Sequence, residues 1–511
     1  MENSNQAMPT YPKSYWRDSV DLPTFDALDK DITADVTIVG GGITGITTAY
    51  LLQKEGFKVV LIEAGRILKG TTGHTTAKIT AQHDIIYNEF IQHLGKEQAR
   101  AYYDANMEAK QFISKIIKEN GIECDFKEQD AIIYSTTEQS LNTLKTEQEA
   151  YEKLGIEHEF LDDIPIESIK ANGALVMKNQ AQFHPLHYLK HLLDTFLKDG
   201  GTVYENTTAI DVEEALKPKV ITLNKNKIES HYVISCSHFP FYDFKGGYFA
   251  RMKVDRSYVI GIKPKEPFPG GMYLSADQPT HSLRSVTVDG EEIVLVSGEG
   301  HKTGHEKDTL KHYEALERFA KETIGVEQFL YRWSAQDLTT LDKVPYIGRI
   351  KSNDSSIYVA TGFRKWGMTS STVAALLFRD ILMKKDNSYR TLYDPARFHA
   401  DPSIRQFIGQ NLDVAGHFIK GKIFLPNKEV QELKPGEGSV VQVNGKRAGA
   451  YVDEEGKLHV VDTTCTHMGC ELEWNNGEHS WDCPCHGSRF SIDGEVMEGP
   501  AERPLDKIDL E

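Results

Sequence analysis

The sequence predicts two kinds of fold in one chain: an α/β fold over residues 34–385 and a small all-β domain over residues 421–511. In the first region, apolar strand-like runs alternate with amphipathic helical segments, which is typical of α/β proteins. In the second, short strand-like runs are separated by Asn-Gly and Glu-Gly pairs, which indicate antiparallel hairpins. Residues 386–420 are polar and weakly periodic, and we expect them to form a connector.

Composition narrows the class of protein. The 58 basic and 75 acidic residues give a net charge of −17 (58 − 75), which argues against nucleic acid or an anionic membrane as a partner. The N-terminal segment 1–33 has no apolar signal-peptide core, and no apolar run approaches the roughly 18 residues of a membrane span. We therefore expect a cytoplasmic protein, in which clustered cysteines serve metal or redox chemistry.

The first strand of the α/β region leads into a glycine-rich turn. The stretch "DVTIVGGGITG" places Gly40, Gly42 and Gly45 in the pattern G-x-G-x-x-G between a strand and a helix. Such glycines allow a sharp turn and close approach to a pyrophosphate, which the helix N-terminus attracts. A second strand ends at Glu63, 18 residues after Gly45, where a carboxylate can accept ribose hydroxyls. The predicted dinucleotide contacts are Gly40, Gly42, Ile43, Thr44, Gly45, Glu63 and Ala64.

Three later motifs carry a resemblance to a known family. They read "GTTGHTTAKIT" (70–80), "RWSAQDLTTLDKVPYIG" (332–348) and "IYVATGFRKWGMTSSTVAALLFRDIL" (357–382). In this order they resemble the D-amino-acid oxidase (glycine/sarcosine oxidase) family of flavoproteins. The resemblance implies FAD as cofactor, bound by a Rossmann-like domain with an interleaved α+β substrate domain. Further implied cofactor contacts are Thr71, Thr72, Gly73, His74, Lys78 and Gly348.

The last of these motifs lies against the flavin ring in that family. The resemblance therefore implies that the isoalloxazine is bordered by Gly362, Phe363, Arg364, Lys365, Trp366, Gly367, Met368 and Thr369. A Gly-rich turn from strand to helix lets backbone N–H groups face a ring carbonyl, and a helix N-terminus stabilises negative charge on the reduced ring. Arg364 and Trp366 are candidate catalytic residues.

A departure from the family pattern bears on the substrate. Amino-acid-oxidising relatives have W-x-G-L-R-P-x-T-x-D, whose Arg binds the substrate carboxylate. Here the stretch begins at Trp333 and has Asp337 at the arginine position. An acid favours a cation, so we expect an amine rather than an α-amino acid, with Asp337 as a candidate catalytic residue. An Asp that caps the next element is the other interpretation. Arg284 and Tyr258 are further candidates for the pocket.

Two patterns favour other activities. Gly298, Gly300 and Gly304 follow a strand in "EEIVLVSGEGHKTG" and can mark a second nucleotide site, for NAD(P)H. In "HPLHYLKHLLD", two histidines and a carboxylate share one helix face, an arrangement that can bind the mononuclear iron of an oxygenase. These three residues are His187, His191 and Asp194.

Four of the six cysteines lie in the last domain. Cys465-x-His467 and Cys483-x-x-His486 are separated by 15 residues, and two thiolates with two imidazoles can hold zinc. The boxes "CTHMGC" and "CPCHGS", followed by "GPAERPL" (499–505), resemble the Rieske family over the whole domain. That resemblance implies a 2Fe-2S centre with Cys465 and Cys483 on one iron and His467 and His486 on the other.

The resemblance to the respiratory type of Rieske protein extends to the surroundings of the centre. It implies a disulfide between Cys470 and Cys485 that joins the two ligand loops, and a hydrogen bond from Ser488 to the cluster. Phe490 stands where that type usually has a second donor, Tyr, so we expect a lower potential. Both histidines have a solvent-facing side in the family, which suggests that an external acceptor docks there.

Together the two sites predict an enzyme that converts a two-electron oxidation into one-electron transfers. A flavin accepts two electrons at once and a 2Fe-2S cluster carries one. We expect an FAD-dependent dehydrogenase that oxidises an amine or amino-acid-like substrate and passes electrons singly to an external acceptor protein. An NAD(P)H-dependent flavin reductase that feeds the cluster and an oxygenase partner is one alternative. A redox-sensing module without catalysis is another.

Overall fold

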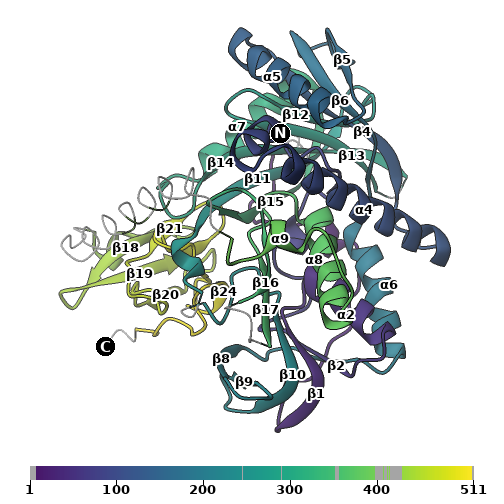
Figure 1. Cartoon of the computed structure of the whole chain (residues 1–511). Coiled ribbons are helices and arrows are strands. Elements are labelled where there is room, and N and C mark those ends of the chain that lie inside the picture. The colour runs from purple at the N-terminus through teal and green to yellow at the C-terminus, as the bar shows by residue number, and fades with distance from the viewer. Residues whose placement is uncertain are drawn as a thin grey trace.

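The computed structural model describes residues 7–243, 246–288, 290–350, 356–397, 407, 411, 414 and 428–508. Two α/β layers built on separate sheets form the main body, and the C-terminal strands form a smaller unit beside it (Figure 1). The predicted fold class is therefore confirmed. Most of the predicted connector lies outside the described residues.

The first sheet is built around parallel strands. Its order is β16-β17-β10-β1-β2-β7, β9 pairs with β10, and β8 pairs with β9. β1 runs parallel to β10 and β2, and β10 runs parallel to β17. The inner ends of β1 and β2 are buried on both faces, as apolar parallel strands require. The bounds are β1 Ile32–Val39, β2 Val59–Ile62, β7 Thr202–Tyr204, β8 Ala209–Glu213, β9 Lys219–Thr222, β10 Lys227–Ser235, β16 Tyr346–Arg349 and β17 Ile357–Thr361.

The second sheet is mostly antiparallel and larger. Its order is β15-β11-β14-β13-β12-β4-β6-β3, with β5 beside β6. The bounds are β3 Lys78–Ile79, β4 Lys127–Ser135, β5 Glu159–Leu161, β6 Gly173–Gln182, β11 Met252–Pro264, β12 Met272–Ser275, β13 His281–Val288, β14 Glu291–Lys302 and β15 Val326–Thr340. Because its strands come from both sides of β7–β10 in the sequence, this sheet is the interleaved part of the α/β region.

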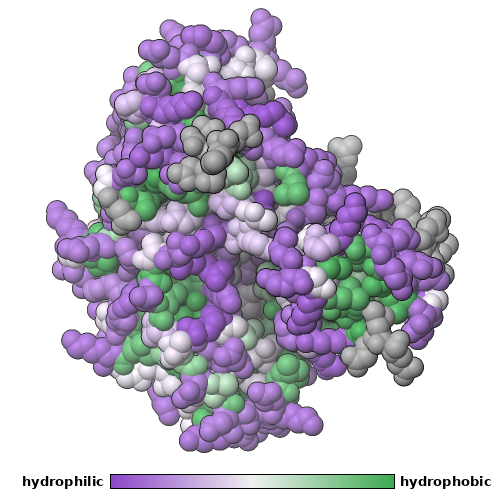
Figure 2. Space-filling view, turned by 180° about the vertical axis from the view of Figure 1, so that it is seen from behind, coloured by the Kyte–Doolittle hydropathy of each residue, from purple (hydrophilic) through white to green (hydrophobic). Residues whose placement is uncertain are grey.

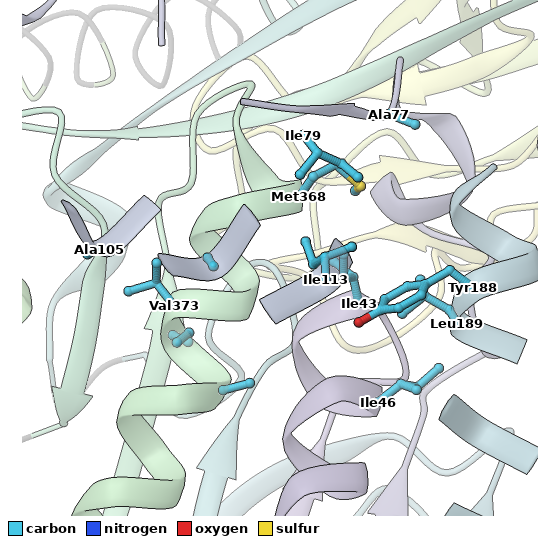
Figure 3. Packing of buried hydrophobic residues seen from close by; sticks show 14 of the residues in the cluster. Ile43, Ile46, Ala77, Ile79, Ala105, Ile113, Tyr188, Leu189, Met368 and Val373 are labelled. Carbon is cyan, nitrogen blue, oxygen red and sulfur yellow. The ribbon is translucent and has the colours of Figure 1, made fainter. Parts of the chain in front are cut away.

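Helices pack on both sheets and enclose the main core. Helix α2 packs against α8 and α6, α4 against α8, and α7 against β11 and β14. Ile43 of α2 lies beside Tyr188 and Leu189 of α6, and Met368 of α8 lies beside Ile79 (Figure 3). The bounds are α1 Tyr15–Asp18, α2 Ile43–Lys54, α3 Tyr87–Leu94, α4 Lys96–Asn120, α5 Glu138–Leu154, α6 Pro185–Lys198, α7 Leu310–Thr323, α8 Gly367–Leu382 and α9 Arg390–Tyr393. Among the described residues, none of the helices combines the length and apolar character that a bilayer crossing requires.

The C-terminal domain consists of two small antiparallel sheets, as the turn signals predicted. β18-β19-β20 form one and β21-β22-β23-β24 the other. Seen from behind, the domain is a lobe beside the main body (Figure 2). The bounds are β18 Gly438–Val443, β19 Lys446–Val452, β20 Leu458–Val461, β21 Glu473–Asn475, β22 Ser480–Asp482, β23 Arg489–Phe490 and β24 Val496–Glu498.

The N-terminal segment runs between the two parts of the molecule. Ser14 Oγ donates to Gly73 O at 2.5 Å, and Trp16 Nε1 donates to Thr75 O at 2.6 Å. The ring of Tyr11 packs against the ring of His479 in the C-terminal domain, with centroids 4.9 Å apart. Residues before the first strand are thus fastened to the main body and also touch the last domain.

Candidate functional site

The glycine-rich turn has the tight geometry that the pattern predicts. Gly40 adopts φ = 111°, and a Cβ there would stand 2.5 Å from Cys236 O of the neighbouring strand. A Cβ on Gly45 would overlap Gly40 O, because helix α2 crosses directly above the turn. Gly42 is the N-cap of α2 and has no capping side chain. The glycines therefore form a tight cradle at a helix N-terminus, of the kind that fits a pyrophosphate.

Glu63 lies at the predicted end of β2, and its carboxylate shapes the cradle. Its oxygens accept the N–H of Gly41 at 2.7 Å and the N–H of Gly65 at 2.9 Å. Burial raises the pKa of Glu63, and these hydrogen bonds oppose the increase. Ala64 follows directly in the same turn. The predicted ribose contact of Glu63 remains a prediction.

Residues 71–78 lie across the start of α2. Thr72 Oγ1 accepts the N–H of Ile43 at 3.0 Å, so the short helix η2, Thr71–His74, sits against the cradle. Lys78 is half-buried and donates to Tyr273 O and to the hydroxyl of Ser282. Burial, followed by repulsion from Arg284, lowers the pKa of Lys78 to about 7. The predicted cofactor segment 71–78 thus contacts both the glycine-rich turn and the second sheet.

The turn from Gly362 to Gly367 connects β17 to α8 and faces the second sheet. Gly362 and Arg364 both have positive φ, and the N–H of Arg364 donates to Leu338 O at 2.9 Å. Phe363 bridges to Thr339 of β15. Lys365 contacts the hydroxyl of Ser257. Met368 and Thr369 follow in the first turn of α8, which is almost completely buried. Gly348 lies apart from this group: a Cβ on it would stand 2.8 Å from Cδ of Pro395.

Asp337 lies on β15 directly opposite Asp255 of β11. The residue is 7% exposed, and within the described part of the chain no group donates a hydrogen bond to it. Its one ion pair is with Lys365, at 3.9 Å. Burial raises the pKa of Asp337 to about 7, and attraction to Lys365 opposes the increase. A buried carboxylate with so few contacts is a strong candidate to receive a cationic group.

Sequence reasoning missed His83. It is fully buried, and its ring stacks on Trp366 with centroids 4.8 Å apart. Nε2 lies 2.8 Å from Thr80 O, which can only accept, so Nε2 carries the proton and Nδ1 accepts from Tyr102 Oη at 2.7 Å. Burial lowers the pKa of His83 to about 3, so the ring is neutral. A lone histidine in a loop gave no signal in the sequence.

The four predicted cluster ligands lie together in the C-terminal domain. The thiols of Cys465 and Cys483 are hydrogen-bonded to each other, and this contact lowers the pKa of Cys465 to about 7. The rings of His467 and His486 are 5.1 Å apart. Both Nδ1 atoms are buried, and Nδ1 of His486 has no hydrogen-bond partner in the described chain. Two adjacent thiols and two buried imidazole nitrogens are the donor set that a Rieske centre needs.

The two ligand loops are held together by a disulfide between Cys470 and Cys485. Ser488 is hydrogen-bonded to the thiol of Cys465, and its Oγ also accepts the N–H of Ala501 at 3.0 Å. Phe490 is fully buried in the same core. The hydroxyl is thus placed beside a ligand sulfur, and its hydrogen bond to the cluster remains a prediction.

His486 faces the main body rather than solvent, and His467 is half-buried. Phe249 contacts His486 with ring centroids 5.4 Å apart and His467 at 6.2 Å, and Phe239 lies 6.5 Å from His467. His486 is only 4% exposed. The expectation of a solvent-facing side was therefore wrong for His486, because Phe249 of the α/β region covers it. His467 is half-buried and has Phe249 and Phe239 as neighbours.

The two pocket candidates have other roles. Arg284 is buried and donates to the carbonyls of Thr76 and Ala77, so it holds the segment that carries Lys78. The hydroxyl of Tyr258 pairs with His301 Nε2 at 2.9 Å, within a cluster on the opposite side of the sheet from Asp255. Neither side chain contacts Asp337.

The patterns that favoured other activities also have structural explanations. Gly298 and Gly300 lie within β14, and a Cβ on Gly304 would stand 2.6 Å from Pro484 N of the C-terminal domain. His187 stacks on His184, and Asp194 pairs with Lys190 at 2.8 Å. His191 is on the same helix, and in the described chain these residues do not form a group with metal-binding geometry.

Comparisons with known proteins agree with both halves of the chain. The family model described as FAD dependent oxidoreductase (DAO) matches residues 35–381, and the one described as Rieske [2Fe-2S] domain matches residues 424–509. The chain is 55% identical over 500 residues to a protein of Bacillus subtilis (strain 168) named as a Rieske 2Fe-2S iron-sulfur protein, YhfW, with 98% of each chain covered. It is 25% identical over 389 residues to gamma-glutamylputrescine oxidoreductase of Escherichia coli (strain K12), covering 73% of this chain and 90% of that one.

A solved structure shares the fold. Glycine oxidase from Geobacillus kaustophilus superposes with a TM-score of 0.62 at 17% identity, covering 72% of this chain and 99% of that one. These findings confirm the predicted oxidoreductase class and the two predicted cofactors, FAD and a Rieske 2Fe-2S cluster.

Proposed function

Since this chain belongs to the FAD dependent oxidoreductase (DAO) family and carries a Rieske [2Fe-2S] domain, we propose that it is an amine dehydrogenase. In this proposal it passes electrons through the Rieske centre, one at a time, to an external acceptor protein. When bound, FAD takes a hydride from the substrate and the 2Fe-2S cluster carries single electrons. The chain's own residues bind the amine, orient it and exclude water.

The observation that carries the substrate class is the buried carboxylate of Asp337. It is 7% exposed and receives no hydrogen bond from the described residues. A protonated amine supplies both the charge and the N–H donors that this group lacks. The similarity to an enzyme named for gamma-glutamylputrescine supports an amine as well.

The neighbours of Asp337 suit the same task. Lys365 supplies a cation at 3.9 Å that also contacts the hydroxyl of Ser257, and its side chain is 52% exposed, so a substrate ammonium can displace it toward solvent. Next to Lys365 in the sequence, Trp366 stacks on the neutral ring of His83, which accepts a hydrogen bond from Tyr102. An ammonium must lose its proton before the amine can give up a hydride, and the carboxylate of Asp337, whose pKa burial raises to about 7, can take that proton. We assign no further general base, because the neutral amine needs none.

We assign the cofactor contacts as the sequence suggested. For FAD they are the glycine-rich turn (40–45), Glu63, Ala64, the segment 71–78 and the turn 362–369. For the cluster they are Cys465, His467, Cys483 and His486. The glycine-rich helix N-terminus at Gly42 supports the first set, and the two thiols with two buried imidazole nitrogens support the second.

Anaerobic mixing of the holoprotein with a panel of primary, secondary and N-methyl amines and of α-amino acids tests the proposal. We expect amines to bleach the flavin absorbance and then to change the circular dichroism of the cluster. Reduction by amino acids alone would contradict the amine class, and rapid bleaching by NADH or NADPH would favour the reductase alternative.

Variants of Asp337 make the test specific. We expect Asp337→Asn and Asp337→Arg to raise KM for amines at least tenfold. Asp255→Asn is the matched control, because Asp255 faces Asp337 but already has an ion pair with Lys253 at 2.9 Å. Unchanged kinetics in both Asp337 variants would remove this carboxylate from the site.

A further inference from the structure

The C-terminal domain has a buried charge cluster that it cannot balance alone. Three carboxylates surround Arg489: Asp482 at 3.2 Å, Glu498 at 3.2 Å and Glu478 at 3.5 Å. The side chains of Arg489, Asp482 and Glu478 are at most 5% exposed. One guanidinium against three carboxylates leaves an excess of negative charge, and buried charge is costly unless it is paired.

The compensating charge comes from the flavin domain. Arg256 of β11 is fully buried and reaches across the interface to Glu498 at 2.8 Å and to Asp482 at 3.9 Å. On its own side it is held by Ser334 Oγ at 2.8 Å and Gln336 Oε1 at 3.2 Å. Asp482 immediately precedes the ligand Cys483, so Arg256 is coupled to the second ligand loop.

The second ligand loop, which carries Cys483 and His486, packs closely against the flavin domain. Gly304 has φ = 73°, and a Cβ there would stand 2.6 Å from Pro484 N and 2.8 Å from the carbonyl carbon of Cys483. On the other side, a Cβ on Gly487 would collide with Val254. Such close approach needs glycine in both domains, and it occurs on both sides of the ligand His486.

Further contacts surround this central area. His305 Nε2 lies 3.1 Å from Pro484 O, and Tyr313 Oη donates to Glu478 at 2.6 Å. Thr309 Oγ1 donates to Asn475 Oδ1 at 2.6 Å and accepts the N–H of Gly477 at 2.8 Å. Hydrogen bonds, ion pairs and backbone contact thus all fix the same relative position.

We propose that the Rieske domain is permanently seated on the flavin domain, and that Arg256 is the positioning residue that completes its charge cluster. This rests on the proposed function in one respect: electrons then cross a fixed interface, and no swing of the cluster domain is needed. The acceptor cannot dock on His486, because that histidine is closed off by the interface.

A disulfide lock tests the fixed position. A Cβ on Gly477 would stand 2.9 Å from Thr309 Oγ1, so cysteines at these two positions meet the Cβ spacing of a disulfide, about 3.5–4.5 Å. Holoprotein of Thr309→Cys/Gly477→Cys is compared with the single variant Thr309→Cys. The flavin is photoreduced with EDTA, and the electron paramagnetic resonance of the reduced cluster is followed.

We expect the double variant to form the disulfide in air, without added oxidant or thiol. Its small-angle scattering profile should match that of the single variant. The rate at which the flavin reduces the cluster should differ by less than twofold between the two variants. A tenfold slower reduction of the cluster in the disulfide-locked protein, or a more compact scattering profile, would contradict a fixed position of the Rieske domain on the flavin domain. If the cluster is reduced in neither form, the proposed function fails, while equal scattering still supports the seat.

Variants of Arg256 test its role independently of the lock. We expect Arg256→Met to lower the midpoint potential of the cluster, since it removes a positive charge beside Asp482, and to enlarge the radius of gyration. Arg256→Lys should restore most of both. The matched control is Lys263→Met on the same strand, whose ion pair with Glu291 at 2.9 Å is far from the interface. An unchanged potential and radius in Arg256→Met would refute the assignment.

Discussion

The replacement Asp337→Asn should make the protein more stable while it weakens amine turnover. Burial raises the pKa of Asp337 to about 7 from its ordinary value of 3.8. The folded protein therefore holds this proton more tightly than the unfolded chain, so ionisation costs stability as the pH rises from 3.8 to 7. At 1.36 kcal/mol per pKa unit, the cost reaches about 4 kcal/mol at pH 8 and is about 2 kcal/mol at pH 5.

Asn is neutral at every pH and avoids this cost. Chemical denaturation of the holoprotein at pH 8 and at pH 5 measures the effect, with the Asp255→Asn variant for comparison. We expect a gain of at most about 4 kcal/mol at pH 8 that shrinks by about half at pH 5. Asp255→Asn should gain less, because it removes only the like charge that helps to raise the pKa of Asp337 and also loses its ion pair with Lys253. No gain at pH 8, or an equal gain at both pH values, would refute the burial argument.

Three further predictions follow from other contacts. Cys470→Ser/Cys485→Ser removes the disulfide between residues 15 apart in sequence, which costs about 3 kcal/mol of folding stability in the chain-entropy treatment. We expect the double variant to lose the absorbance of the cluster faster in denaturant than the wild type. Loss at the wild-type rate would contradict this prediction. Arg284→Met frees the carbonyls of Thr76 and Ala77, so FAD affinity measured by fluorescence should fall at least tenfold, whereas Lys127→Met, an exposed neighbour that donates to Thr287, should leave it unchanged. Gly304→Val should slow cluster reduction by the photoreduced flavin at least tenfold while flavin binding persists, and a wild-type rate would show that the ligand loop tolerates a side chain there.

Much of the molecule follows from local patterns in the sequence. The cradle from Gly40 to Gly45 and the ligand boxes around Cys465 and Cys483 are runs of neighbouring residues, so their spacing alone is informative. The all-β character of the last domain follows from its turns for the same reason. These features need no knowledge of how distant segments pair.

What could not be predicted depends on contacts between distant segments. Gly304 was read as part of a nucleotide motif, because its real neighbour, Pro484, is 180 residues away in sequence. Arg284 and Tyr258 were assigned to one pocket, yet they point to opposite sides of the sheet, which only the strand register reveals. Phe249 and Arg256 carried no motif at all, and their importance comes from the partners that the interface brings to them.

The N-terminal segment limits the order in which this protein can fold and the ways in which its domains can be exchanged. The ring of Tyr11 packs on His479, and the Arg332 guanidinium donates both to Thr10 O and to Gly477 O. During synthesis, the contact between Tyr11 and His479 can form only after nearly the whole polypeptide has been made. A chimera that exchanges only the last domain would lose the contact of Tyr11 with His479, so a chimera that keeps it must take the first residues and the last domain from the same protein.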